Sequence, residues 1–182
     1  AEPIPINSQT MLFPCPLKQK VSGLDPTRWI PSREKDDNLI RIGVAHGGLD
    51  ILPSTPNFPI SPNRVECADL DYLALGDWHG LIEHGRSVYS GTMEPTSFSE
   101  KNPGNVLIID ISATGEPPSI EPVRVARLRW EEFDLDLQDE SDVRQFQVDL
   151  DKLPSIDTTV IRVNIGTGSV LTDSVASQLG GV

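Results

Sequence analysis

Cysteine is scarce in this sequence, and long hydrophobic runs do not occur. The two cysteines, Cys15 and Cys67, are too few for a disulfide scaffold and lack the spacing of a zinc or redox site. Apolar runs such as residues 106–109 are far shorter than the ~20 residues that cross a bilayer, so no membrane partner is expected. With little cysteine and no basic, apolar leader, the sequence predicts a cytoplasmic location.

Basic residues are scarce as well. The 182 residues include 15 Lys and Arg against 27 Asp and Glu, which gives a formal net charge of -12. A protein that holds DNA by charge alone needs clustered Lys and Arg to neutralise phosphates. The composition therefore argues against a simple basic DNA-binding domain.

Proline is abundant, and the sequence favours short strands over long helices. It has 16 prolines in 182 residues, above the average usage of ~5%. A short helix is expected from Asp25, with Pro26 at its first position, and further helices are expected near residues 143–153 and 171–179. Alternation and short apolar runs between turn residues predict strands at residues 10–13, 40–45, 71–75, 87–91, 105–112, 132–137 and 158–164.

Two of the three histidines come directly after predicted strands. His46 ends one strand beside a glycine turn, and His79 follows another strand, with Asp77 two residues before it. Binding and catalytic side chains gather in such loops. Alternate residues of an extended chain share a face, so Asp77 and His79 can serve one ion or two neighbouring ions. Imidazole and carboxylate ligands together suit Mn, Fe or Zn.

Other polar features have a structural interpretation beside a functional one. His84 lies in a polar stretch that is expected to be a surface hairpin turn. Trp78 either stacks on a substrate or lines the wall of the site. The seven acidic residues of the stretch 131–142 favour a solvated face, and Gly166 and Gly168 favour a strand-to-helix turn over a phosphate loop. The sequence contains no motif for a serine or cysteine nucleophile.

Three stretches follow one another in a characteristic order. They are residues 42–47 (Ile-Gly-Val-Ala-His-Gly), 71–80 (Asp-Tyr-Leu-Ala-Leu-Gly-Asp-Trp-His-Gly) and 89–95 (Tyr-Ser-Gly-Thr-Met-Glu-Pro). This order and spacing resemble the calcineurin-like metallophosphoesterases, and within them the DNA repair exonucleases of the SbcD type. In that branch one strand ends in a metal-binding histidine, a later strand ends in Gly-His-x-His, and a Tyr-Ser-Gly-Ser/Thr-x-x-Pro segment follows.

The resemblance implies a site for two divalent metal ions, with Mn as the expected metal. It implies that His46 and Asp77 bind one ion and that His79 binds the other. Asp77 replaces the first histidine of Gly-His-x-His, and a carboxylate can fill that place with a changed metal preference. The implied reaction is the hydrolysis of phosphodiester bonds by a metal-activated hydroxide.

The resemblance also implies a fold class and a division of the chain. The expected class is α/β: part of a metallophosphoesterase-type layered β-sandwich flanked by helices, followed by part of a small α+β capping domain. Residues 1–118 are expected to be the C-terminal half of the phosphoesterase core. Residues 119–182 are expected to begin a capping domain of the DNA-recognition type. The boundary lies at the Gly- and Pro-containing stretch 114–118.

Some motifs of the family are missing from this sequence. Asp-x-His, Gly-Asp-x-x-Asp and Gly-Asn-His-Asp precede the matched stretches in the family, and residues 1–40 contain none of them. The histidine of Gly-Asn-His-Asp is the family's proton donor to the leaving oxygen, so no catalytic residue is assigned within this chain. We expect these motifs upstream of the sequence, and we expect the chain alone to be inactive.

The resemblance implies partners that the residues do not themselves demonstrate. These are DNA, bound through the full-length protein, a long coiled-coil ATPase, and a second copy in a homodimer. The net charge of -12 favours two alternatives. One is a metallophosphoesterase that acts on nucleotides or other phosphoesters, and the other is a non-catalytic interaction or structural module.

Overall fold

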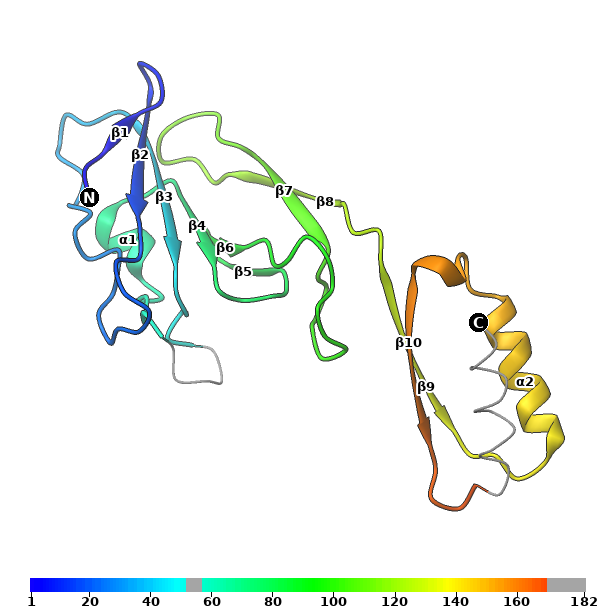
Figure 1. Ribbon diagram of the computed structural model, residues 1–182. Coiled ribbons are helices and arrows are strands. Elements are labelled where there is room, and N and C mark those ends of the chain that lie inside the picture. The colour runs from blue at the N-terminus through cyan, green and yellow to red at the C-terminus, as the bar shows by residue number, and fades with distance from the viewer. Residues whose placement is uncertain (52–56, 170–182) are drawn as a thin grey trace. The chain divides into compact units, whose positions relative to one another are not determined.

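The computed structural model describes residues 1–51 and 57–169, and the predicted helix at residues 171–179 lies outside this part. The chain is a mixed α/β protein, mostly strands in sheets, with two α-helices among the described residues (Figure 1). It divides into two compact units. Unit 1 comprises Ala1–Glu94 and Glu100–Ala126, and unit 2 comprises Pro95–Ser99 and Arg127–Val182. None of the described helices is long and apolar enough to span a membrane.

A six-stranded sheet forms the centre of unit 1 (Figure 1). Its strand order is β1-β2-β3-β4-β6-β5, in which β2, β3, β4 and β6 are mutually parallel and the edge strands β1 and β5 are antiparallel to their neighbours. The carboxyl ends of the parallel strands therefore meet at one edge of the sheet. The strands are β1 (Ile4–Pro5), β2 (Thr10–Cys15), β3 (Ile40–His46), β4 (Tyr72–Gly76), β5 (Ile82–His84) and β6 (Ser87–Tyr89).

One face of this sheet is buried, and the other is open at β3 but covered at Tyr72 of β4 and Val88 of β6. The register pairs Gly43 of β3 with Leu73 of β4, and a Cβ atom on Gly43 would come within 2.7 Å of the Leu73 side chain, so glycine permits close packing there. The short helix α1 (Arg64–Ala68) contributes Val65 to the same core. On the opposite face Val44 is 43% exposed.

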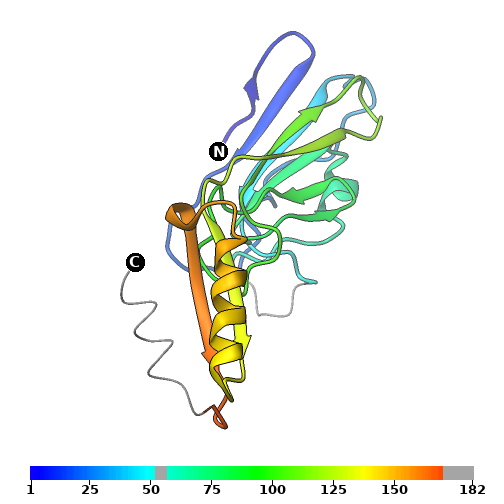
Figure 2. The ribbon, with the colours of Figure 1, turned by 90° about the vertical axis from the view of Figure 1, so that its right-hand side faces the viewer.

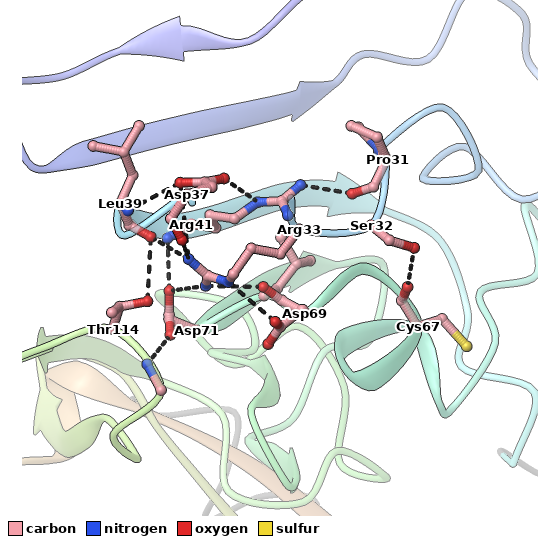
Figure 3. A network of polar contacts seen from close by, with 12 residues as sticks. Pro31, Ser32, Arg33, Asp37, Leu39, Arg41, Cys67, Asp69, Asp71 and Thr114 are labelled. Atoms are coloured by element: carbon pink, nitrogen blue, oxygen red, sulfur yellow. Dashed lines mark hydrogen bonds and ion pairs between the residues drawn. The ribbon is translucent and has the colours of Figure 1, made fainter. Parts of the chain in front are cut away.

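A buried polar network lies where β3 and β4 begin (Figure 3). The side chain of Asp71 is fully buried. Its carboxylate accepts hydrogen bonds from Arg33 Nη2 (2.8 Å), the backbone N of Arg41 (2.8 Å) and the backbone N of Gly115 (2.6 Å). A buried carboxylate requires such partners because it has lost its hydration. Asp71 thus ties β3, the loop before it and the loop after β7 to the start of β4.

The hairpin of β7 (Asn105–Asp110) and β8 (Ser119–Arg124) completes unit 1. The strand β7 was expected from the sequence, whereas β8 was not, because Pro122 stands inside it. Proline is tolerated in a strand whose N–H side has no partner to bond, as at an edge. Unit 1 continues to Ala126, beyond the boundary expected after Pro118, because β8 pairs with β7 along its whole length.

Unit 2 is a β-α-β arrangement. The strands β9 (Arg129–Leu135) and β10 (Thr159–Ile165) are parallel, and the helix α2 (Glu140–Asp151) packs on them, followed by the short 3-10 helix η1 (Ile156–Thr158) (Figure 2). Phe146 of α2 meets Phe133 of β9 with ring centroids 5.4 Å apart. Within the acidic stretch 131–142, Asp139 caps α2 in a capping box with Asp142.

Two local predictions are wrong. The helix expected from Asp25 is a turn, because the Asp25 carboxylate accepts the Thr27 N–H (2.7 Å) and Ile30 N bonds to Thr27 O (2.9 Å), while Pro31 prevents a longer helix. The strand expected to stop before Pro14 continues to Cys15. Beyond Leu12, β2 pairs only with β3, so the missing N–H of Pro14 breaks no bond to β1.

Candidate functional site

Two of the predicted metal ligands meet at the carboxyl edge of the sheet. His46 is the last residue of β3 and pairs in register with Gly76, the last residue of β4, which Asp77 follows. The Nε2 atom of His46 lies 3.4 Å from Oδ1 of Asp77, and the two side chains are 55% and 43% exposed. An imidazole and a carboxylate are therefore adjacent and reachable from solvent, as a metal ligand pair must be.

The backbone at this point is shaped to bring the pair together. Asp77 has φ 114°, which is unusual for a residue with a side chain, and such backbone outliers concentrate at functional sites. A Cβ atom on Gly76 would lie 3.0 Å from Nδ1 of His46, so glycine makes room for the imidazole at the end of β4. The Gly47 N–H bonds to Gly76 O at 3.1 Å and holds the two strand ends in register.

The third predicted ligand, His79, has a different neighbour. Its Nδ1 atom lies 2.7 Å from Oε1 of Glu100, whose side chain is only 6% exposed, while the His79 side chain is 58% exposed. Glu100 was not among the residues expected at this site. It is 21 residues away from His79 and belongs to no motif used above, so only the fold brings the two together.

The segment 89–92 braces the loops that follow β3 and β4. The buried Tyr89 hydroxyl donates to Gly47 O (2.7 Å) and accepts from Leu49 N (2.8 Å), just beyond His46. The backbone N of Thr92 donates to His79 O (2.9 Å). Burial raises the pKa of Tyr89, and the negative charge of Asp77 adds to this effect. The Tyr-Ser-Gly-Thr segment therefore holds the loops that carry His46 and His79 in place through these hydrogen bonds.

The remaining candidates lie beside the core or in the hairpin. Trp78 is partly buried and packs against the hydrophobic core of unit 1, which favours its interpretation as a wall of the site. Stacking of Trp78 on a substrate stays a prediction. His84 ends β5 opposite Ser87 of β6, within the hairpin expected from the sequence.

The donor set fits part of a metal coordination shell. His46 and Asp77 supply one nitrogen and one oxygen within reach of a single ion, a combination suited to Mn, Fe or Zn. In the described residues, however, no three His, Cys, Asp or Glu side chains gather as a metal-binding group. A groove of about 490 Å³ adjoins this edge, with His46 and Gly76 among its lining residues. Further ligands are needed to complete two ion sites.

Sequence comparisons do not assign the chain to a family. No protein-family model matches it, and no curated protein is significantly similar to it.

Proposed function

We propose that this chain is part of a two-metal phosphoesterase of the calcineurin-like superfamily, a DNA repair exonuclease of the SbcD type. The observation that carries the proposal is the meeting of His46 and Asp77 at the ends of two adjacent parallel strands. Residues 89–92 add support. In the family a motif of this kind follows the ligand histidines, and in this chain it contacts the loops at both His46 and His79.

The open face of the unit 1 sheet supports the finer fold proposal. Half-exposed apolar side chains lie on part of this face, among them Ile42, Val44 and Ala74, whereas Tyr72 and Val88 on the same face are buried. Exposed apolar surface of this kind marks a contact with another layer. We infer that further layers of a phosphoesterase core cover it, and that the part of unit 2 from Arg127 onwards begins the capping domain.

The residues of this chain then have separate roles. His46 and Asp77 hold one ion and His79 holds the other, while Tyr89 and Thr92 keep the two loops in place. When bound, the two ions polarise the phosphate and activate the attacking water. The motifs missing from the chain supply the other ligands and the proton donor in this proposal.

The acidic composition favours a second candidate. A net charge of -12 is unsuited to contact with DNA. The second candidate is therefore a phosphoesterase that acts on nucleotides or other small phosphoesters. In the exonuclease proposal, DNA is bound by the rest of the protein and by a coiled-coil ATPase partner. An assay on two substrates distinguishes the two candidate functions. Release of nucleotides from linear double-stranded DNA supports the exonuclease, and hydrolysis of free nucleotides supports the small-molecule phosphoesterase.

The decisive experiment is Mn-dependent hydrolysis of bis-p-nitrophenyl phosphate by the complete protein to which we propose that this chain belongs. His79→Ala is expected to lower the rate by more than the ~10–100-fold typical of an outer-shell partner. His84→Ala, a histidine of the same unit in the β5–β6 hairpin, is the matched control and is expected to keep full activity.

Two results would contradict the proposal. Equal activity of His79→Ala and the unchanged protein would show that His79 is no ligand. If the complete protein hydrolyses no phosphoester in the presence of Mn, a non-catalytic interaction module becomes the better explanation.

A further inference from the structure

Glu100 is a buried acid placed against an exposed histidine. Its side chain is 6% exposed, and its Oε1 atom lies 2.7 Å from Nδ1 of His79. Burial of a carboxylate is costly unless donors satisfy it. At this distance the contact is a charge-assisted hydrogen bond, the shorter and stronger kind.

The backbone holds Glu100 beside His79 independently of that bond. Gly80 packs directly on the carbonyl oxygen of Lys101, with no room for a Cβ atom between them. The Leu81 N–H bonds to Asn102 O at 3.4 Å. The residues after Glu100 therefore run alongside those after His79, and the carboxylate approaches the ring from a fixed direction.

This contact determines which ring nitrogen carries the proton. An ionised carboxylate only accepts hydrogen bonds, so Nδ1 of His79 must donate. In a neutral imidazole the other nitrogen, Nε2, then carries the lone pair. Histidines that bind metal are commonly oriented in this way, with the second ring nitrogen donating to a carboxylate.

We propose that Glu100 is a positioning residue that holds His79 in the Nδ1–H tautomer and so makes Nε2 the atom that binds the metal ion. This inference rests on the proposed function for the metal, whereas the tautomer itself is a property of the chain alone. In this proposal Glu100 acts through the His79 ring.

The tautomer can be measured without metal on the 182-residue chain. Long-range ¹H–¹⁵N correlation spectra at about pH 8.5, where an ordinary imidazole is neutral, distinguish protonated from unprotonated ring nitrogens. The chain has only three histidines, so His→Gln variants assign every signal. We expect His79 to show a protonated Nδ1 and an unprotonated Nε2.

Three variants isolate the effect of Glu100. In Glu100→Ala the His79 signals are expected to shift toward the Nε2–H form that predominates in free imidazole side chains. In Glu100→Gln the amide oxygen still accepts from Nδ1, so the Nδ1–H form is expected to persist. Glu83→Ala removes an exposed acid beside His84 and is the matched control, with no change expected at His79.

The outcomes separate this inference from the proposed function. A protonated Nε2 on His79 in the unchanged chain, or identical His79 signals with and without Glu100, would overturn the inference. In the complete protein, Glu100→Ala is expected to lower Mn²⁺ affinity by about 10–100-fold, with Glu100→Gln closer to the unchanged protein. If the tautomer shifts as expected but the complete protein neither binds Mn²⁺ nor hydrolyses phosphoesters, the positioning stands and the proposed function fails.

Discussion

At the start of β3 and β4 the carboxylate of Asp71 is fully buried, whereas at the ends of the same strands His46 and Asp77 are about half-exposed. Asp71 is satisfied by three close donors from other segments. His46 and Asp77 are 3.4 Å apart, longer than a good hydrogen bond. The two ends of one pair of strands thus use polar side chains differently: those at one end hold segments of the fold together, and those at the other end are open to solvent.

The largest expected effect is at the buried end. Asp71→Asn leaves Arg33 facing an uncharged group in a buried site and is expected to lower the free energy of unfolding by about 3–5 kcal/mol. Urea denaturation followed by tryptophan fluorescence measures this. Asp69→Asn is the matched control, because Asp69 also pairs with Arg33 but is 58% exposed, and it is expected to cost less than about 1 kcal/mol. Equal losses would contradict the contrast between the two ends.

A smaller effect is expected at Tyr89, near the carboxyl ends of β3 and β4. Tyr89→Phe keeps the ring but leaves the buried Gly47 carbonyl and Leu49 N–H without the hydroxyl, at an expected cost of about 1–3 kcal/mol. Hydrogen exchange at Leu49 is expected to accelerate more than at the centre of β3. Tyr72→Phe, whose hydroxyl has no hydrogen-bond partner among the described residues, serves as the control. Unchanged exchange at Leu49 would show that Tyr89 does not brace the loop.

The two tyrosines also provide a pH test, one near each end. Burial and the charge of Glu83 raise the pKa of Tyr72 to about 12, and burial raises the pKa of Tyr89. Because unfolded tyrosine titrates at about pH 10, both groups stabilise the fold below that pH. Each contribution is lost as the pH rises through the raised pKa of the folded group, which is about 12 for Tyr72. Near-ultraviolet titration should show phenolate later in the folded chain than in urea. Coincident curves would contradict the burial of both hydroxyls.

The smallest effect on stability is expected at His46. Its side chain is 55% exposed, so His46→Ala should change the free energy of unfolding by less than about 0.5 kcal/mol. The same urea denaturation measures it, with Asp71→Asn as the positive control. A loss of several kcal/mol would mean that His46 serves the fold rather than a ligand.

Sequence patterns predicted most of the strands because their apolar residues alternate or cluster between turn residues. The strands expected at 40–45, 71–75 and 105–112 correspond to β3, β4 and β7, with ends displaced by one or two residues. The pattern failed at β8, where Pro122 masks the strand, and at α1, which is only one turn long beside a proline-rich loop. In both places tertiary contacts outweigh local preference.

The position of His46 and Asp77 at strand ends was expected from the sequence, whereas the contacts made by distant segments were not. His46 and Asp77 meet because β3 and β4 are parallel neighbours. That the two residues share one site was implied only by the family resemblance. Glu100 and the hydroxyl of Tyr89 reach across 21 and 42 residues of sequence. No periodicity reports such contacts, since they follow from the order of strands in the sheet.

The hydrogen bond between Tyr89 and Gly47 affects the order in which contacts can form while the chain is being synthesised. Domains generally fold as units during synthesis, so a contact can form only after both of its partners have emerged. The loop after His46 can be fastened only when Tyr89 has emerged, 42 residues later, and His79 meets its acid only when Glu100 has followed. A nascent chain that stops before residue 89 therefore carries His46 and His79 but neither of the contacts that hold them. The buried end waits longer still, because the third donor to Asp71 is the N–H of Gly115.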